Sequence, residues 1–274
     1  MSGRIYAEAR WEDGPRGSTP LEEPGRRVMG TLAGWLEAAK ARLGLETGVE
    51  AGRDDAHARA GHVDPAELAR HEEIRLVQRV FMTPGVRAPR TVVFAGVEHD
   101  NGCADVCVRA GQTLAQLKLQ SVCVVDANLR APVLHRVLGT DNQDGFAVAV
   151  EQAGFTSTFP QRVTPENLWL LPSGSSRSEP ELLLTTDRLR PQVRELGAMF
   201  DHVLVNAPPI NVYAESLALS QCVDGVVLVL QAHATRREIA RNVKAHLEDL
   251  SVPLLGVVLN SRTFPIPDVV YRLL

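Results

Sequence analysis

The chain has 274 residues, 45% of them hydrophobic, and a formal net charge of -4 at pH 7. This length allows one large domain or two modest domains with a sizeable core. The slight acidity gives no electrostatic reason to expect a nucleic-acid partner, because nucleic-acid-binding domains are usually strongly basic. No apolar run approaches the roughly 18 residues of a membrane span, and the first residues lack the apolar core of a signal peptide. We therefore predict a cytoplasmic protein whose only contact with a membrane is indirect.

Residues 1–62 form a low-complexity region rich in Gly, Pro, Ala, Glu and Arg. Segments of this composition bury too little apolar surface to fold alone, so we expect most of the region to be disordered. Within it, apolar residues recur at helical spacing over residues 26–43 and predict an amphipathic helix. Two interpretations of this helix stay open, docking on a partner or membrane and packing on its own domain. A membrane-surface helix would need a richer Lys and Arg face.

Residues 63–274 have the pattern of one α/β domain. A helix is predicted to begin after Asp64, with Pro65 at its first position, and to run until Pro84. Apolar strands and amphipathic helices then alternate, which predicts a doubly wound, mainly parallel sheet with helices on both faces. The predicted strands cover residues 91–95, 122–125, 168–171, 202–205 and the two ends of 224–260.

The first strand leads into a loop closed by Gly102 and then into a helix predicted for residues 104–119. Strand, loop and helix in this order are typical of a phosphate-binding loop with the pattern GxxxxGK[ST]. In that pattern glycines let backbone N–H groups approach phosphate, the lysine meets the outer phosphates and the hydroxyl ligates magnesium. Here Cys103 stands at the lysine position, Ala104 at the hydroxyl position and Asp105 just after it. The loop has kept its glycine and lost its charged and metal-binding groups.

Three polar residues end predicted strands, namely Asp126, Asn206 and Asn260. In open parallel sheets, ligands bind outside the carboxyl ends of the strands. We therefore expect these three side chains to lie at one edge of the sheet, beside the Gly102 loop.

Six short motifs follow one another in the chain, "DNGCAD", "DANLRAP", "LPSG", "NAPP", "DGVVLVLQAHATRRE" and "LGVVLN". In this order and spacing, residues 63–274 resemble the cytoplasmic domain of bacterial tyrosine kinases and polysaccharide co-polymerase ATPases of the capsular exopolysaccharide type, relatives of the MinD/ParA group. The resemblance implies a P-loop NTPase-like domain with ATP or ADP as its ligand. It also implies a membrane polysaccharide co-polymerase or exporter component as partner, which would hold the protein peripherally at the inner membrane.

The departures from the family pattern fall on its catalytic positions. In the family, the loop lysine neutralises phosphate charge, while the hydroxyl and acidic groups position Mg²⁺. Asp126 matches the first acid of the family's second motif, whereas Asn128 replaces the second acid and Asn206 replaces the aspartate of the third motif. An amide brings no charge to hold magnesium. These substitutions argue against Mg²⁺ and predict catalysis reduced by orders of magnitude, because such groups act as a unit.

Several residues allow two interpretations. Asp126 is a candidate catalytic or metal-binding acid, or it caps a helix. Asn260 resembles the adenine-reading asparagine of the MinD/ParA relatives, or it simply ends a strand. Cys103 and Cys107, one helical turn apart, could form a redox or metal pair, although such cysteines are more often small buried residues.

The resemblance also leaves a homo-oligomer open. The family's oligomerising helix has the form ExxRxxR, and here Glu72 and Arg75 match it while Gln78 replaces the second arginine.

Two functions follow from this combination. The favoured one is a catalytically impaired kinase-like protein that regulates or assembles a capsule or exopolysaccharide export machine, binding ATP or ADP without efficient turnover. The alternative is a residual or divergent ATPase or protein-tyrosine kinase, which would use Asp126 and the Gly102 loop with a cation supplied by another subunit.

Overall fold

The computed structural model describes residues 6–8, 65–83, 88–118, 120–152, 158–164, 167–175 and 178–261. The predicted helix at 26–43 and nearly all of the region 1–62 lie outside the described residues. No helix in the described ranges is long and apolar enough to cross a membrane.

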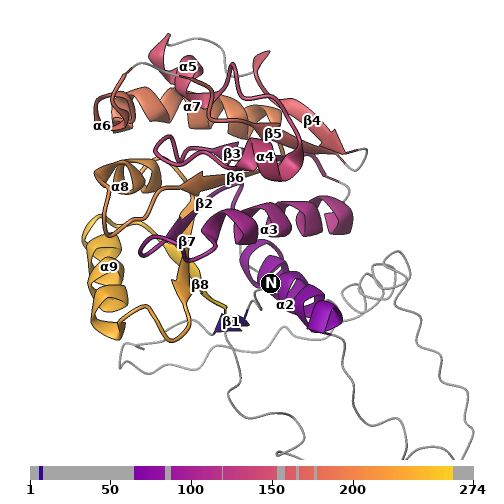
Figure 1. The fold of residues 1–274 in the computed structure, drawn as a ribbon, viewed down its shortest axis with the longest axis vertical. Coiled ribbons are helices and arrows are strands. Elements are labelled where there is room, and N and C mark those ends of the chain that lie inside the picture. Colours follow the sequence, from indigo (N-terminus) through magenta and orange to yellow (C-terminus); the bar gives the residue numbers. More distant parts are fainter. Residues whose placement is uncertain are drawn as a thin grey trace, which may run out of the picture. The chain divides into compact units, whose positions relative to one another are not determined.

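An eight-stranded sheet lies at the centre, with the strand order β1-β8-β7-β2-β6-β3-β5-β4 (Figure 1). Its strands are β1 (Tyr6–Glu8), β2 (Thr91–Gly96), β3 (Val122–Asp126), β4 (Gln161–Thr164), β5 (Leu168–Leu171), β6 (His202–Ala207), β7 (Gly225–Gln231) and β8 (Leu254–Asn260). All neighbours from β8 to β5 are parallel, whereas β1 and β4 pair antiparallel at the two edges. The predicted mainly parallel α/β sheet is confirmed.

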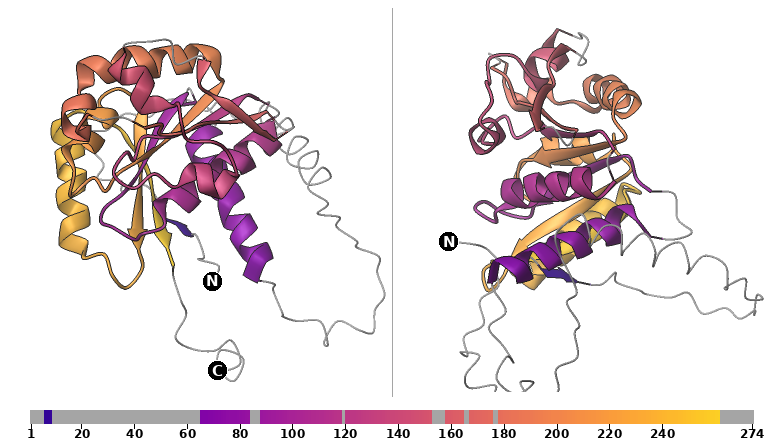
Figure 2. Two further views of the ribbon diagram at one scale, coloured as in Figure 1. Left: turned by 45° about the horizontal axis from the view of Figure 1, so that its top comes forward. Right: turned by 90° about the vertical axis from the view of Figure 1, so that its right-hand side faces the viewer.

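Helices cover both faces of the sheet, as the prediction requires. They are α2 (Pro65–Phe81), α3 (Cys103–Lys118), α4 (Leu134–Leu138), α5 (Phe146–Glu151), α6 (Pro180–Leu183), α7 (Thr186–Met199), α8 (Ala214–Ser220) and α9 (Arg237–Asp249). Helices α2 and α3 pack together on one face, and α7, α8 and α9 lie on the other (Figures 1 and 2). Because the central strands are covered on both sides, every residue of β2, β3 and β6 is buried.

The elements that the sequence did not predict are all short. The helices α4, α5, α6 and α8 have between 4 and 7 residues, which is too few to show helical periodicity. Strand β1 lies within the region for which we expected disorder. It pairs with β8, and its 3 residues are too few to show an alternating apolar pattern.

Two aspartates fasten the amino-terminal ends of the parallel strands. Oδ2 of Asp224 accepts the Arg90 and Thr91 N–H groups, both at 2.8 Å, which joins the start of β7 to the start of β2. Oδ2 of Asp201 accepts the Ser121 N–H at 2.9 Å and the Ser121 hydroxyl at 2.8 Å, joining the residues before β6 and β3. The hydrogen bonds from Ser121 hold the pKa of Asp201 below its usual value.

Replacing Asp201 by Asn should therefore change how the free energy of unfolding depends on pH in the acidic range. A lowered folded-state pKa contributes stability above the unfolded-state pKa of about 3.9, and this contribution is lost as the pH falls through the folded-state value. We expect wild type to exceed Asp201→Asn in free energy of unfolding at neutral pH and the difference to shrink below about pH 4. Urea unfolding across pH measures it, with the exposed Asp249→Asn as control; a pH-independent difference would contradict the assignment.

Candidate functional site

The candidate site lies at the carboxyl ends of the parallel strands. Asn206 of β6 is in register with Phe94 of β2 and with Asp126 of β3. Asn260 ends β8, beside β7. The sheet thus places the strand-end residues at the edge from which the Gly102 loop leaves β2, as the sequence predicts.

Gly102 closes the loop in a conformation that suits glycine. Its φ of 72° lies in the left-handed region, and its carbonyl accepts the Val106 N–H at 3.1 Å in the first turn of α3. Asn260 donates from Nδ2 to the Asn101 carbonyl at 2.9 Å, and a Cβ at position 102 would overlap that nitrogen. Asn260 is therefore a brace for the loop, which favours a structural role over adenine reading. Its Oδ1 is buried and has no hydrogen-bond partner among the described residues.

The side chain of Asn101 occupies the inside of the loop. It is only 5% exposed, and its Oδ1 accepts the Cys103 N–H at 3.0 Å. Its Nδ2 donates to the Glu98 carbonyl, across the loop. A Cβ on Gly96 would overlap the Asn101 carboxamide, so glycine at 96 leaves the room that this side chain fills. Asn101 was not among the predicted site residues, although Asn before Gly is a known turn signal because the Asn side chain can bond to the backbone of its own turn.

The residues that replace the lysine and hydroxyl of the loop lie in the first turn of α3. Cys103 is buried, Ala104 is partly buried and Asp105 is exposed. Burial raises the pKa of Cys103 to about 12 and raises the pKa of Cys107 well above its usual value. Both thiols are thus neutral at physiological pH, which favours small buried residues over a reactive pair.

Asp126 uses both carboxyl oxygens within the protein. It is fully buried, and Oδ2 accepts the N–H groups of Val133 at 3.0 Å and Leu134 at 2.9 Å, where α4 begins. Oδ1 accepts the Asn206 amide at 3.1 Å. Burial raises the pKa of Asp126, and the hydrogen bonds from Leu134, Asn206 and Val133 oppose that rise. The contacts favour the helix-capping interpretation over a metal ligand or catalytic acid.

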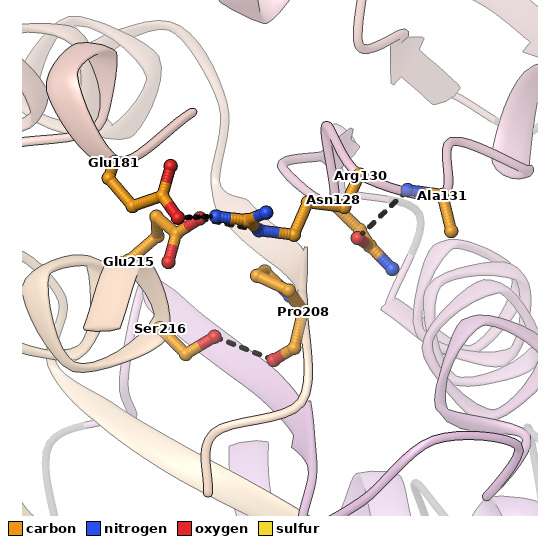
Figure 3. Close-up of polar contacts among 7 residues, drawn as sticks. All are labelled: Asn128, Arg130, Ala131, Glu181, Pro208, Glu215 and Ser216. Atoms are coloured by element: carbon orange, nitrogen blue, oxygen red, sulfur yellow. Dashed lines mark hydrogen bonds and ion pairs between the residues drawn. The ribbon is translucent and has the colours of Figure 1, made fainter. Parts of the chain in front are cut away.

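Asn128 likewise serves its own turn, because its Oδ1 accepts the Ala131 N–H at 3.2 Å (Figure 3). The described part of the chain contains no group of three or more His, Cys, Asp or Glu that could hold a metal ion. Magnesium prefers carboxylate, phosphate and water oxygens, and two of the family's acidic positions here carry amides. Together with the filled loop, these residues do not fit a magnesium-bound nucleotide as they stand.

An ion-pair cluster around the buried Glu215 lies beside the site and was not predicted as a unit. Arg130, in the "DANLRAP" motif, donates from Nε to Oε1 of Glu215 at 2.8 Å and also pairs with Glu181. Its guanidinium carbon lies 4.2 Å from the centre of the Tyr213 ring. Figure 3 shows the arginine reaching from the loop after β3 toward α6 and α8.

The cluster holds α8 against the site. The Glu215 side chain is 1% exposed, against 26% for Arg130, and Glu215 Oε2 has no hydrogen-bond partner among the described residues. The next residue, Ser216, donates its hydroxyl to the carbonyl of Pro208, which directly follows β6, at 2.6 Å (Figure 3). Because Glu215 is so deeply buried, its charge depends on Arg130 for compensation.

Comparison with known proteins gives relatives for this chain, although no family model matches it. The chain is 28% identical over 143 residues to tyrosine-protein kinase YwqD of Bacillus subtilis, a match that covers 52% of this chain and 60% of that protein. It is 25% identical over 246 residues to tyrosine-protein kinase wzc of Salmonella typhi, which covers 88% of this chain and 33% of that protein. The chain therefore spans less than two thirds of the length of either relative.

Solved structures show the same fold. The kinase domain of Escherichia coli tyrosine kinase ETK matches with a TM-score of 0.63 at 20% identity, covering 75% of this chain and 82% of that one. Two other neighbours, at TM-scores of 0.53, are complexes with ATP and with ADP and magnesium. The fold is that of the P-loop ATPases, with ParA-type proteins among its neighbours. Within that class, the sequence relatives of this chain are bacterial tyrosine kinases.

Removing Arg130 should expose the dependence of Glu215 on its partner. Arg130→Met leaves a buried carboxylate uncompensated, which typically costs about 3–5 kcal/mol. The double variant Arg130→Met/Glu215→Leu should recover most of that loss, because it removes both charges together. Urea unfolding of wild type, Arg130→Met, Glu215→Leu and the double variant gives a double-mutant cycle that measures the interaction between the two residues.

Glu181→Gln is the matched control, because its side chain is 53% exposed. It should cost much less than Arg130→Met, because exposed ion pairs contribute little to stability. If Arg130→Met cost no more than this control, Glu215 would not depend on the arginine.

Proposed function

We propose that the chain is a catalytically impaired bacterial tyrosine kinase-like protein that acts as a regulator or assembly partner in capsule or exopolysaccharide biosynthesis and export. The observation that carries this proposal is the internal pairing of the site. The Asn206 amide donates to Oδ1 of Asp126 at positions where the family has two acids. Oδ2 of Asp126 accepts the Val133 and Leu134 N–H groups at the start of α4.

This pairing bears directly on catalysis. Phosphoryl transfer depends on fixed positive charge and on a correctly placed metal ion to stabilise the transferring group. Cys103 supplies no cation, and the amides of Asn128 and Asn206 supply no charge for a metal. Each such loss commonly reduces the rate of catalysis by orders of magnitude. Because the groups act as a unit, restoring one of them does not restore the rate.

The preserved parts of the chain support a binding role. The strand order, the covered core and the braced loop are maintained although the charged groups are substituted. A membrane polysaccharide co-polymerase or exporter component is the partner that the resemblance implies, and it would bring the chain to the inner membrane. A homo-oligomer is part of the same proposal. In α2, Glu72 and Arg75 match the family's oligomerising motif and pair with each other, Nη1 to Oε1, at 2.6 Å.

ATP or ADP, in this proposal, binds without efficient turnover and requires the loop to rearrange. The alternative of a residual or divergent ATPase or tyrosine kinase is less well supported. It needs Asp126 as a free acid, whereas both Asp126 oxygens accept hydrogen bonds from the protein.

The test is turnover by the full chain. With Mg²⁺ and ATP, wild type should release no more phosphate and carry no more phosphotyrosine than Asp126→Ala, with the ETK kinase domain assayed beside them as an active fold neighbour. Circular dichroism checks that the variant is folded, because Asp126 caps α4. Tyrosine phosphorylation that wild type performs and Asp126→Ala does not would overturn the proposal.

A further inference from the structure

We propose that the Asn101 side chain is a built-in occupant of the phosphate loop, which keeps the loop closed to the phosphates of a nucleotide until the side chain leaves. The inference rests on the proposed function, because it concerns how the same impaired site is regulated. It adds that nucleotide binding is opposed by one particular side chain.

The first N–H donor of α3 is already paired with Asn101. The N–H of Cys103 is the first of the helix, and the first four N–H groups of any helix lack partners within it. In a phosphate-binding loop, such groups face the oxygens of an anion. Here Oδ1 of Asn101 takes the Cys103 N–H at 3.0 Å. An amide oxygen with its partial negative charge thus stands in for a phosphate oxygen.

The Asn101 side chain also bonds to the opposite side of the loop. Nδ2 of Asn101 donates to the Glu98 carbonyl, so one carboxamide joins both limbs of the loop. A phosphate has only acceptor oxygens and could not make this second bond. The contact therefore suits a resident amide and not an anion.

Two neighbouring residues, Gly96 and Asn260, hold the Asn101 side chain in place. Gly96, at the end of β2, leaves the space that the carboxamide fills. Asn260, at the end of β8, donates to the Asn101 carbonyl at 2.9 Å and fixes the backbone from which the side chain projects. Asn101 is only 5% exposed, so its side chain is enclosed by these neighbours and is not turned toward solvent.

The consequence for ligands follows from competition. A group tethered at its site competes at a high effective concentration, commonly in the millimolar range or above. A nucleotide binds only the fraction of molecules whose loop is open, and its apparent affinity falls by that fraction. The chain should therefore bind ADP weakly, and a partner that withdraws Asn101 would raise the affinity.

Two variants remove the occupant by independent routes. Asn101→Gly deletes the carboxamide, and Gly96→Ala places a Cβ where the carboxamide lies. Titration calorimetry of the full chain should show at least tenfold tighter ADP binding than wild type in both. Asn101→Asp is the control for charge, because it keeps the size of the side chain and the acceptor for the Cys103 N–H, loses the donor to the Glu98 carbonyl and adds a negative charge that repels phosphate. It should show no gain.

A second measurement holds even where a variant folds poorly. Amide hydrogen exchange of Cys103 in wild type should be slow without nucleotide, because its N–H is already bonded. Fast exchange of that amide, or equal ADP affinity in wild type and both loop-opening variants, would overturn the inference. Turnover is measured separately. The proposed function is contradicted by tyrosine phosphorylation that wild type performs and Asp126→Ala does not, whereas unchanged ADP affinity in the loop-opening variants contradicts only the role of Asn101.

Discussion

The arrangement at the strand ends depends on the burial of Asp126. A fully buried carboxyl group must find hydrogen-bond partners, and this one finds three N–H donors, two at the start of α4 and one from Asn206. Those bonds fix the loop after β3, and that loop carries Arg130. Arg130 in turn compensates Glu215 and so positions α8. A single buried acid thus organises one side of the site through a short chain of polar contacts.

The exchange of acids for amides changes what the site needs in order to be stable. Two carboxylates at the Asp126 and Asn206 positions would repel each other in a buried setting and would need a cation between them. With Asn206 as donor, the pair is satisfied without an ion. The same holds at the loop, where Asn101 satisfies the Cys103 N–H without a ligand. At both places, hydrogen bonds within the chain satisfy groups that would otherwise need a bound ion or ligand.

The sequence predicts much of this fold and less of its site. Apolar strands such as β2 and β6 are predicted by continuous runs of apolar residues, and the long helix α3 by periodic ones. Their bounds agree with the predicted bounds to within one or two residues. The short helix α4 could not be predicted, because its five residues are too few to show a helical period and its cap, Asp126, lies eight residues away at the end of β3. The positions of Asn206 and Asn260 at strand ends follow from topology. Their partners do not, because choosing between a ligand and a neighbouring backbone group requires distances that a sequence lacks.

The filled loop also has a consequence for how such a chain changes over evolutionary time. A mutation that restored lysine at position 103 would meet a loop whose interior Asn101 still occupies, so the new charge would have no phosphate to bind. Conversely, a mutation that emptied the loop first would leave the Cys103 N–H unpaired and gain no catalytic group. The two positions are therefore epistatic, and neither reversal improves catalysis alone. Such coupling means that the effect of a substitution at either position depends on the residue at the other.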